Sequence, residues 1–273
     1  MNARKAAREL APRLASAGVA DSGFEAELLT REAAGISRSQ FFADPTLASE
    51  AAERLEQWSA RRALREPTPY ITGHREFYGR EFAVGPGVLV PRPETELLVE
   101  LALAELDADP TSIVLEVGTG SGAVAVSVAA ERPGSTVVAT EISPEALAFA
   151  RSNAAVQGAS IHFLLADLAA PVGRAGVVLA NLPYIPTWEI DALEPEVSRW
   201  EPRVALDGGS DGFALIRRLV DDCDVRLQPR LLALEVAFGQ AEGVAAILSS
   251  LGRQPWTRKD LTGIDRVVCA RWA

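Results

Sequence analysis

The sequence predicts an α/β protein built on a mostly parallel β-sheet that helices cover on both faces. Short apolar runs alternate with helix-like segments from about residue 96 onward, and this alternation is typical of parallel sheets. At 273 residues the chain also exceeds the ~100 to 200 residues of a usual single domain, so we expect a smaller companion domain. The first sixty-odd residues carry helical periodicity only, which predicts that this companion is helical.

The N-terminal segment is predicted to be a small helical bundle. Ser22 and Glu25 have the spacing of a capping box ahead of several apolar positions, which predicts that a helix starts there. Asp44 and Pro45 interrupt the pattern, and a further helix is expected to run to about Arg65 before two prolines end it.

Residues 67–95 are punctuated by prolines and glycines and are predicted to form a linker that carries a β-hairpin, with β-like runs at 82–84 and 88–90. A helix over 94–106 then leads into the alternating part of the chain. The predicted strands of that part are 113–117, 137–140, 161–165, 177–180, 231–236 and 266–270. Helices are expected to begin at Gly122, Pro144 and Gln240 and to cover 212–225.

Composition excludes several classes of protein. No apolar stretch approaches the ~20 residues of a membrane helix, and the charged N-terminus lacks the apolar run of a secretory signal. The net charge of −10 disfavours free nucleic acid as a partner, because cationic groups drive that binding. Cys223 and Cys269 lack metal-type spacing and are expected in the core, which favours a reducing compartment and no zinc site. We therefore expect a soluble, cytoplasmic protein.

Five arginines cluster where the helical segment meets the linker: Arg61, Arg62, Arg65, Arg75 and Arg80. They could face an anionic partner, but charges that flank a helix end are more often a solvated face. The solvated face is the favoured interpretation.

A glycine-rich turn follows the first predicted strand and opens a helix. The turn comprises Gly118, Thr119, Gly120, Ser121 and Gly122. In an open parallel sheet, ligands bind beyond the carboxyl ends of the strands, and glycines allow the backbone to approach a ligand closely. The turn therefore indicates a nucleotide-like cofactor. Its spacing lacks the dinucleotide Gly-x-Gly-x-x-Gly pattern, and such turns also arise when a helix merely packs closely on a strand.

Polar residues follow the next two strands as well. Glu141 ends the second strand, where a carboxylate can accept both hydroxyls of an adenosine ribose. Asp167 follows the third, where it can accept from an adenine amino group, and Leu168 beside it offers the ring an apolar wall. Asp167 taken alone is explained equally well as a helix cap or turn residue.

The string from Asn181 to Tyr184 discriminates best between functions. It follows a wholly apolar run, and the Asn181 side-chain oxygen and the Leu182 carbonyl can together accept both hydrogens of one NH2 group. Tyr184 can stack on a flat substrate group, while Pro183 stiffens the turn. These four residues are the predicted catalytic and substrate-binding residues, which would orient a planar nitrogen towards an electrophile. Plain turns also contain Asn and Pro, but few place an aromatic residue there.

Several strings together resemble a known family. Residues 181–184 resemble the Asn-Pro-Pro-Tyr signature of amino-methyltransferases, and the glycine turn resembles their S-adenosylmethionine motif. Further segments are similar to those of the HemK/PrmC release factor glutamine methyltransferases, namely 69–73, 77–79, 90–96, 201–209, 211–212 and 265–268. The resemblance covers roughly 65–270 closely, whereas the helical N-terminus matches in size and type only.

The resemblance implies a Rossmann-like, S-adenosylmethionine-dependent methyltransferase fold with a mostly parallel seven-stranded sheet. It also implies a helical substrate-recognition domain over 1–66, a β-hairpin linker over 67–95 and a catalytic domain over 96–273. The implied reaction moves a methyl group from S-adenosylmethionine, leaving S-adenosylhomocysteine, to the glutamine amide in the Gly-Gly-Gln loop of peptide-chain release factors. Besides this protein substrate, we expect no metal, nucleic-acid or membrane partner, and a monomer.

The resemblance also assigns the site. The glycine turn, Glu141, Asp167, Leu168 and Asn181 would bind the cofactor. Leu182 departs from the signature at its first proline, but the chemistry needs only a backbone carbonyl there, and leucine supplies one.

Other functions and roles stay open at this point. The Asn-Leu-Pro-Tyr string also resembles ribosomal RNA adenine dimethyltransferases, so the alternatives are an adenine-N6 methyltransferase acting on DNA or RNA and an adenine-nucleotide or NAD-binding protein. Arg92, Glu94 and Thr95 either shape the cofactor pocket or form a local cap and ion pair. Neither His74 nor His162 is expected to act as a base.

Overall fold

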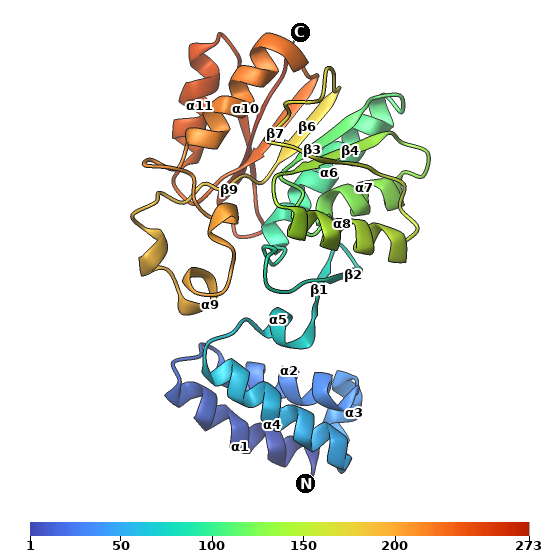
Figure 1. The fold of residues 1–273 in the computed structure, drawn as a ribbon, viewed down its shortest axis with the longest axis vertical. Helices are drawn as coiled ribbons and strands as arrows, with labels where there is room; N and C mark the ends of the chain where they lie inside the picture. Colours follow the sequence, from blue (N-terminus) through green and yellow to red (C-terminus); the bar gives the residue numbers. More distant parts are fainter. Residues whose placement is uncertain (273) are drawn as a thin grey trace. The chain divides into compact units, whose positions relative to one another are not determined.

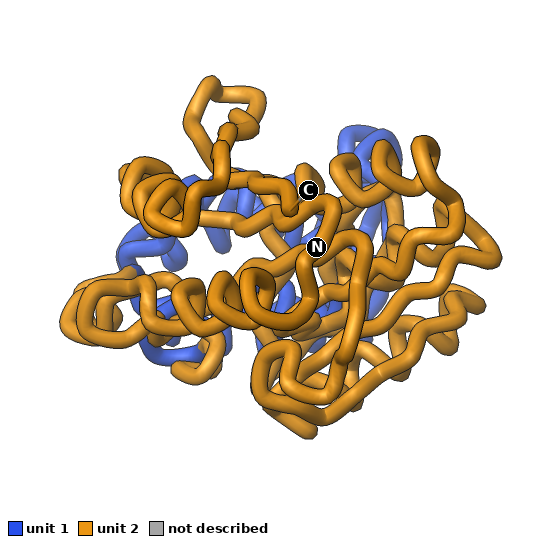
Figure 2. Tube along the Cα trace, turned by 90° about the horizontal axis from the view of Figure 1, so that it is seen from above, with its two compact units in different colours: residues 1–74, 194–200 blue, residues 75–193, 201–273 orange. Residues whose placement is uncertain are grey.

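The computed structural model describes residues 1–272, which form two compact units (Figure 2). The first unit is Met1–His74 together with Glu194–Trp200, and the second is Arg75–Leu193 together with the chain from Glu201 onward. The chain therefore passes from one unit to the other three times. Among the described residues, none of the helices combines the length and the apolar character needed to cross a membrane.

The first unit is helical. Its helices are α1 (Ala3–Ser16), α2 (Ser22–Ala34), α3 (Arg38–Phe42), α4 (Ser49–Ala63), α5 (Thr68–Thr72) and the short α9 (Pro195–Ser198) (Figure 1). Its core is built from Leu10, Leu14, Leu29, Phe41 and Leu55, all at most 5% exposed. The predicted helical bundle is therefore present, with α9 added from a distant part of the sequence.

The predicted capping box at Ser22 is wrong. Helix α2 does begin at Ser22, but no side chain caps its first turn. Glu25 instead accepts hydrogen bonds from Arg62 and Thr68. The capping box of this unit lies at α3, where the side chains of Ser37 and Gln40 bond to each other's backbone N–H groups.

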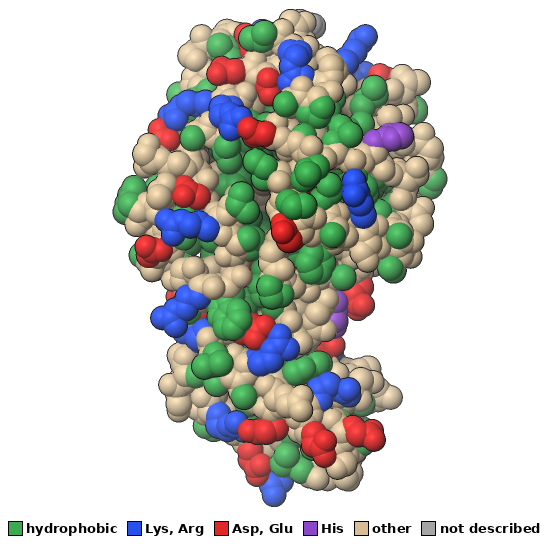
Figure 3. All heavy atoms as spheres, in the orientation of Figure 1, with side chains coloured by type: hydrophobic (Ala, Val, Ile, Leu, Met, Phe, Trp, Pro, Cys, Tyr) green, Lys and Arg blue, Asp and Glu red, His purple; other side chains and the backbone are tan. Residues whose placement is uncertain are grey.

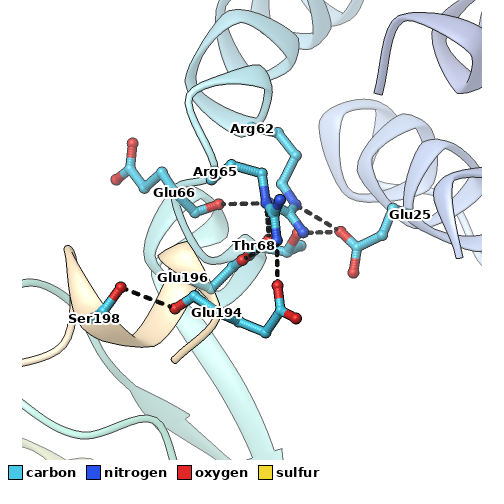
Figure 4. A network of polar contacts seen from close by, with 8 residues as sticks. All are labelled: Glu25, Arg62, Arg65, Glu66, Thr68, Glu194, Glu196 and Ser198. Carbon is cyan, nitrogen blue, oxygen red and sulfur yellow. Dashed lines mark hydrogen bonds and ion pairs between the residues drawn. The ribbon is translucent and has the colours of Figure 1, made fainter. Parts of the chain in front are cut away.

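Two of the five clustered arginines, the buried Arg62 and the partly buried Arg65, bond to carboxylates of the helical unit, which corrects the interpretation of a solvated face (Figure 4). Arg62 is 5% exposed and donates to Glu25 at 3.1 Å and to Glu196 at 2.8 Å. Arg65 donates to Glu196 at 2.6 and 2.7 Å and to Glu194 at 2.8 Å. These arginines hold Glu194–Trp200 within the helical unit and therefore bind the chain's own carboxylates.

Figure 3 shows Lys and Arg side chains mixed with Asp and Glu side chains over the face it draws. Across residues 1–272, many charged side chains form ion pairs within the chain, whichever face they lie on. Arg61, for example, bonds to Glu66 at 2.5 and 2.8 Å, and Arg80 of the second unit bonds to Glu131 at 2.5 Å.

The hairpin lies earlier than predicted. Its strands are β1 (His74–Phe77) and β2 (Arg80–Ala83), and residues 88–90 form no strand. The two residues between the strands, Tyr78 and Gly79, both have positive φ (51° and 69°), as a two-residue hairpin turn requires. Phe77 and Phe82 pack edge to face at 6.0 Å and anchor the hairpin to the core.

The second unit contains the predicted mostly parallel sheet, and its seven strands are confirmed (Figure 1). The strands are β3 (Val114–Val117), β4 (Val137–Glu141), β5 (His162–Leu165), β6 (Val177–Ala180), β7 (Leu231–Glu235), β8 (Trp256–Lys259) and β9 (Asp265–Ala270). Their order is β5-β4-β3-β6-β7-β9-β8. Strands β3 to β7 are parallel, and β9 is antiparallel to β7 and β8. Only β8 was not predicted, because this edge strand is mostly exposed and polar.

Helices cover both faces of the sheet, as predicted. On one face lie α6 (Glu96–Ala108), α7 (Ala123–Glu131) and α8 (Pro144–Val156), and on the other lie α10 (Ala214–Asp222) and α11 (Ala241–Ser250). Neighbouring strand residues point to opposite cores, so Val114 joins the first and Leu115 the second. The two cysteines, Cys223 and Cys269, are free and fully buried there, as expected.

Four short helical segments complete the second unit: η1 (Pro93–Thr95), η2 (Ile190–Ala192), η3 (Arg203–Ala205) and η4 (Cys223–Leu227). The first of these precedes α6, and the last continues α10.

Candidate active site

A cavity of about 440 Å³ lies at the carboxyl ends of β3, β4, β5 and β6. The predicted site residues that line it are Gly118, Thr119, Gly120, Ser121, Glu141, Asp167, Leu168, Asn181, Leu182 and Pro183. Gly122 and Tyr184 do not line it. The structure thus brings the ends of four strands to one cavity, at the edge where open parallel sheets bind ligands.

Two explanations of the glycine turn apply to different residues of it. A Cβ atom on Gly122 would lie 3.1 Å from the Ala150 Cα atom, so glycine is needed there for α7 to pack on α8. Gly120 lines the cavity with a φ of 55°, and a Cβ atom there would meet only Val88 at 3.8 Å. Close packing therefore explains Gly122, while the cavity side of the turn is open to a ligand.

Glu116 fixes the turn from beneath. Its side chain accepts from the Thr119 hydroxyl at 2.5 Å and from the Ala125 N–H at 2.9 Å. Burial raises the pKa of Glu116 to about 8. The carboxyl group therefore links the glycine turn to the first turn of α7, a role that sequence reasoning did not assign.

Glu141 joins the turn after β4 to the glycine turn. One carboxylate oxygen accepts from the Gly120 N–H at 2.9 Å, and the other accepts from the N–H groups of Ile142 and Ser143 at 2.8 and 2.9 Å. A carboxylate offers about four acceptor positions, so these three bonds leave about one free. A ribose that bonds to Glu141 through both hydroxyls would replace at least one of them.

Asp167 and Leu168 lie where the sequence placed them, beyond β5. Asp167 is about half exposed and pairs with Arg218 at 2.6 Å, a partner that sequence spacing did not predict. Leu168 has a positive φ of 48° and is 8% exposed. The roles of these residues toward an adenine ring stay predictions.

Asn181 is held by two side chains from other elements. Its amide nitrogen donates to Glu235 at 2.9 Å and to the Thr95 hydroxyl at 3.2 Å. Parallel pairing of β6 with β7 matches Ala180 with Leu234, so Asn181 and Glu235 are the next residues in register. Both amide hydrogens are thus engaged, and the side-chain oxygen is the end left for another donor.

Glu235 was missed by sequence reasoning. It is 3% exposed, and its second oxygen has no hydrogen-bond partner within residues 1–272. Burial raises its pKa to about 7. The signal in the sequence was a carboxylate ending an apolar strand, the same pattern that identified Glu141.

The backbone of the turn after β6 is held by the segment 206–212. The Gly208 N–H donates to the Ile185 carbonyl at 2.9 Å, and a Cβ atom on Gly208 would lie 2.8 Å from the Pro183 oxygen. Gln240 donates to the Tyr184 carbonyl at 2.8 Å. Burial raises the pKa of Tyr184 to about 12. The glycines of this segment therefore allow close contact between two backbone stretches.

The open question about Arg92, Glu94 and Thr95 has a separate answer for each residue. Arg92 lines the cavity and donates to both oxygens of the buried Glu201 at 2.7 and 2.8 Å. Glu94 lies 3.8 Å from Arg266 and does not line the cavity, whereas Thr95 does line it and contacts Asn181 as described.

Neither histidine lines the cavity: His74 bonds to Glu32 at 3.2 Å, and His162 is exposed on β5. In the described part of the chain, no group of three or more His, Cys, Asp or Glu residues could hold a metal ion.

A solved structure with this fold is a methyltransferase. The T. thermophilus 16S rRNA methyltransferase RsmC, in complex with AdoMet and guanosine, matches with a TM-score of 0.52 at 18% identity over 73% of this chain, which spans half of that structure. At this identity the likeness concerns the fold alone. Residues 94–191 also match the family model described as the methyltransferase small domain. The fold, together with this match, is that of the methyltransferase class.

Full-length relatives narrow the class. The release factor glutamine methyltransferase of Geobacter sulfurreducens is 42% identical over 94% of this chain and 92% of its own. That of Cereibacter sphaeroides is 42% identical over 99% of both chains. Residues 5–73 match the family model described as the PrmC N-terminal domain. The chain belongs to the release factor glutamine methyltransferase family.

Proposed function

We propose that this protein transfers a methyl group from S-adenosylmethionine to the side-chain amide nitrogen of the glutamine in the Gly-Gly-Gln loop of peptide-chain release factors. The observation that carries the proposal is that Asn181, Leu182 and Pro183 line the same cavity as the glycine turn. We propose that the Asn181 side-chain oxygen and the Leu182 carbonyl face this space as acceptors for an NH2 group. Family membership supports the identity of the substrate.

The cavity fits the proposed cofactor. Its volume of about 440 Å³ lies in the usual range of small-molecule sites, and the glycine turn gives it an open backbone wall. We propose that Gly118–Ser121, Glu141, Asp167 and Leu168 hold the cofactor, with Asn181 at the boundary to the acceptor. When bound, S-adenosylmethionine supplies a methyl carbon on a positively charged sulfur, and that carbon bonds to the amide nitrogen while the carbon–sulfur electron pair stays on sulfur.

We propose that the protein acts mainly by orienting the acceptor. An amide nitrogen is a poor nucleophile because its lone pair is delocalised, so alignment with the methyl group is the main lever. The Asn181 side-chain oxygen and the Leu182 carbonyl would accept the two hydrogens of the glutamine NH2 group. As the nitrogen gains positive charge, its hydrogens bind these oxygens more strongly, which stabilises the transition state specifically. The proton that the methylated nitrogen must lose can pass to water.

Leu182 supports this role without the family proline. Its side chain is 4% exposed, and a Cβ atom on Gly118 would lie 3.5 Å from it, so it packs under the glycine turn. We propose that this packing stiffens the turn as a proline ring would, while the carbonyl stays available.

Exposed apolar side chains beyond the strand ends support a protein as substrate. Ile142 follows β4, Trp188 follows the turn after β6, and Phe238 follows β7, with exposed fractions of 53%, 74% and 77%. A contiguous exposed apolar patch is typical of a binding surface, and all three side chains follow strands that end at the edge of the sheet where the cavity lies. We propose that they contact the release factor around its Gly-Gly-Gln loop and that the helical unit recognises another part of it. We further propose that the enzyme acts as a monomer in the cytoplasm, where release factors function.

The test is intact-mass analysis of a release factor after incubation with the protein and S-adenosylmethionine. We expect a mass increase of one methylene group that maps to the loop glutamine and is absent when this glutamine is replaced by alanine. Labelled cofactor with DNA or RNA is the parallel assay. Label in nucleic acid alone would overturn the proposal.

A further inference from the structure

We propose that Glu235 and Thr95 are positioning residues that fix which end of the Asn181 amide is offered to the acceptor nitrogen. The inference rests on the proposed function and adds to it two residues that would not themselves touch the substrate. Glu235 ends β7, and Thr95 ends η1, so they approach Asn181 from two separate elements.

The orientation matters because the two ends of an amide group have nearly the same shape and opposite chemistry. If the NH2 end of Asn181 faced the NH2 group of the substrate glutamine, two hydrogen-bond donors would oppose each other. The glutamine would then lose a hydrogen bond. The backbone of the turn does not prevent a half-turn rotation of the Asn181 side-chain amide, because the two ends of that group have nearly the same shape. The choice must come from a neighbour that only accepts, supported by a second acceptor for the other amide hydrogen.

Glu235 is such a neighbour. An ionised carboxylate only accepts, and its oxygen lies 2.9 Å from the Asn181 amide nitrogen. The Thr95 hydroxyl oxygen accepts the second hydrogen at 3.2 Å. Both residues are buried, at 3% and 6% exposure, so water does not replace them easily and the bonds act in a low-dielectric environment. Together they leave only the side-chain oxygen of Asn181 for the substrate.

Protonation of Glu235 would remove this discrimination, because a neutral carboxyl group can donate to the Asn181 oxygen and favour the rotated amide. The charged groups around Glu235 act in both directions. Burial first, and then Glu94, raise its pKa, while the Thr95 hydroxyl, Arg266 and Arg92 lower it. Tyr184 is the other titratable neighbour and stays neutral at ordinary pH, since burial and then Glu235 itself raise its pKa to about 12. The net pKa of Glu235, about 7, makes the fraction of correctly held Asn181 fall as pH falls through neutrality.

The experiment compares the variants Glu235→Gln, Thr95→Val and Thr95→Ser by kcat, by KM for the release factor and by the Kd of the cofactor. We expect kcat to fall about 100-fold in E235Q and about 10-fold in T95V, the range for loss of groups that hold a transition-state contact. T95S retains the hydroxyl and should restore most of the kcat lost in T95V. The cofactor Kd should stay within about twofold in all three, because none of them removes a group proposed to hold the cofactor.

The matched control is Glu242→Gln, the same change at an exposed position on α11, which should leave kcat unaltered. The wild-type kcat should rise with pH through an apparent pKa near 7, and this step should vanish in E235Q, a result that a merely structural role would not produce.

Full kcat in E235Q and T95V, with the pH step retained, would overturn the positioning role. Failure of the proposed function is distinguishable, because the wild-type protein itself would then not methylate the release factor. In that case the same variants are measured with the acceptor that does take the label.

Discussion

Glu196 of the helical unit is partly buried and Glu235 of the sheet is almost fully buried, yet their pKa values move in opposite directions. Burial alone would raise the pKa of Glu196, but hydrogen bonds from Arg65 and Arg62 outweigh it, and the pKa lies below its ordinary value. Glu235 forms no ion pair within residues 1–272 and bonds to an amide instead, so burial raises its pKa to about 7. A guanidinium partner keeps a carboxylate ionised, so that the pair stabilises the fold. With a neutral partner, a buried carboxylate can gain or lose its proton near neutral pH.

The variant Asn181→Ala tests whether the pair that Glu235 forms with Asn181 serves the reaction. The variant removes the partner of Glu235 that faces the cavity, and we expect kcat to fall about 1000-fold, the upper range for loss of one transition-state acceptor. Cofactor affinity measured by calorimetry should remain largely intact. Unchanged turnover would remove Asn181 from its proposed role.

The variant Arg62→Ala tests whether the ion pairs of Glu196 stabilise the fold. This arginine is 5% exposed, and its loss leaves Glu25 and Glu196 each without one charged partner. Breaking a buried ion pair in this way costs about 3 kcal/mol of unfolding free energy. Denaturant titration followed by circular dichroism measures it. A loss below 1 kcal/mol, the scale of an exposed pair, would show that the network contributes little stability.

Glu235→Gln should stabilise the protein while it slows the reaction. A carboxylate whose folded pKa is raised from 4.5 to about 7 gives its full stability at low pH and loses it as pH rises between those values. At pH 8 the glutamine variant should therefore gain about 3 kcal/mol of unfolding free energy over the wild type, and little at pH 4. An equal difference at both pH values would mean that Glu235 is not held at a raised pKa.

The smallest effect is expected for Arg13→Ala, which serves as the exposed counterpart of Arg62. Arg13 bonds to both oxygens of Glu56 at 2.8 Å, but the two side chains are 51% and 66% exposed. Exposed pairs contribute about 0.2 to 1 kcal/mol and are screened by salt. The unfolding free energy should change within that range, and the change should shrink in high salt. A cost equal to that of Arg62→Ala would remove burial as the reason for the difference.

The sequence predicted those features that depend on residues close together in the chain. Apolar runs identified six of the seven strands, and the turn after each of four strands contributed residues to the cavity. The hairpin was misplaced because the decisive signal was the left-handed conformation of Tyr78, a bulky residue in which positive φ is rarely anticipated. Glu196 and Arg62 are 134 positions apart, and one sequence contains no information that such a pair meets.

The residues that hold Asn181 in place were not predictable from the sequence, because they too come from distant positions in the chain. Asn181 could be chosen from its own string, but Thr95 and Glu235 reach it from positions 86 and 54 residues away. Gly208 is glycine because another backbone stretch passes against it, which the sequence alone does not reveal.

The short stretch Glu194–Trp200 has a consequence for any attempt to isolate the helical unit. A fragment cut from the protein at residue 74 would contain Arg62 and Arg65 but neither Glu194 nor Glu196, so two guanidinium groups would lose their main acceptors. The excised fragment would thus be less stable than the unit in the whole protein. To restore the unit, the segment Glu194–Trp200 would have to be added as a separate peptide or fused through a linker. The boundary of this unit is a property of the folded chain, not of a contiguous stretch of gene.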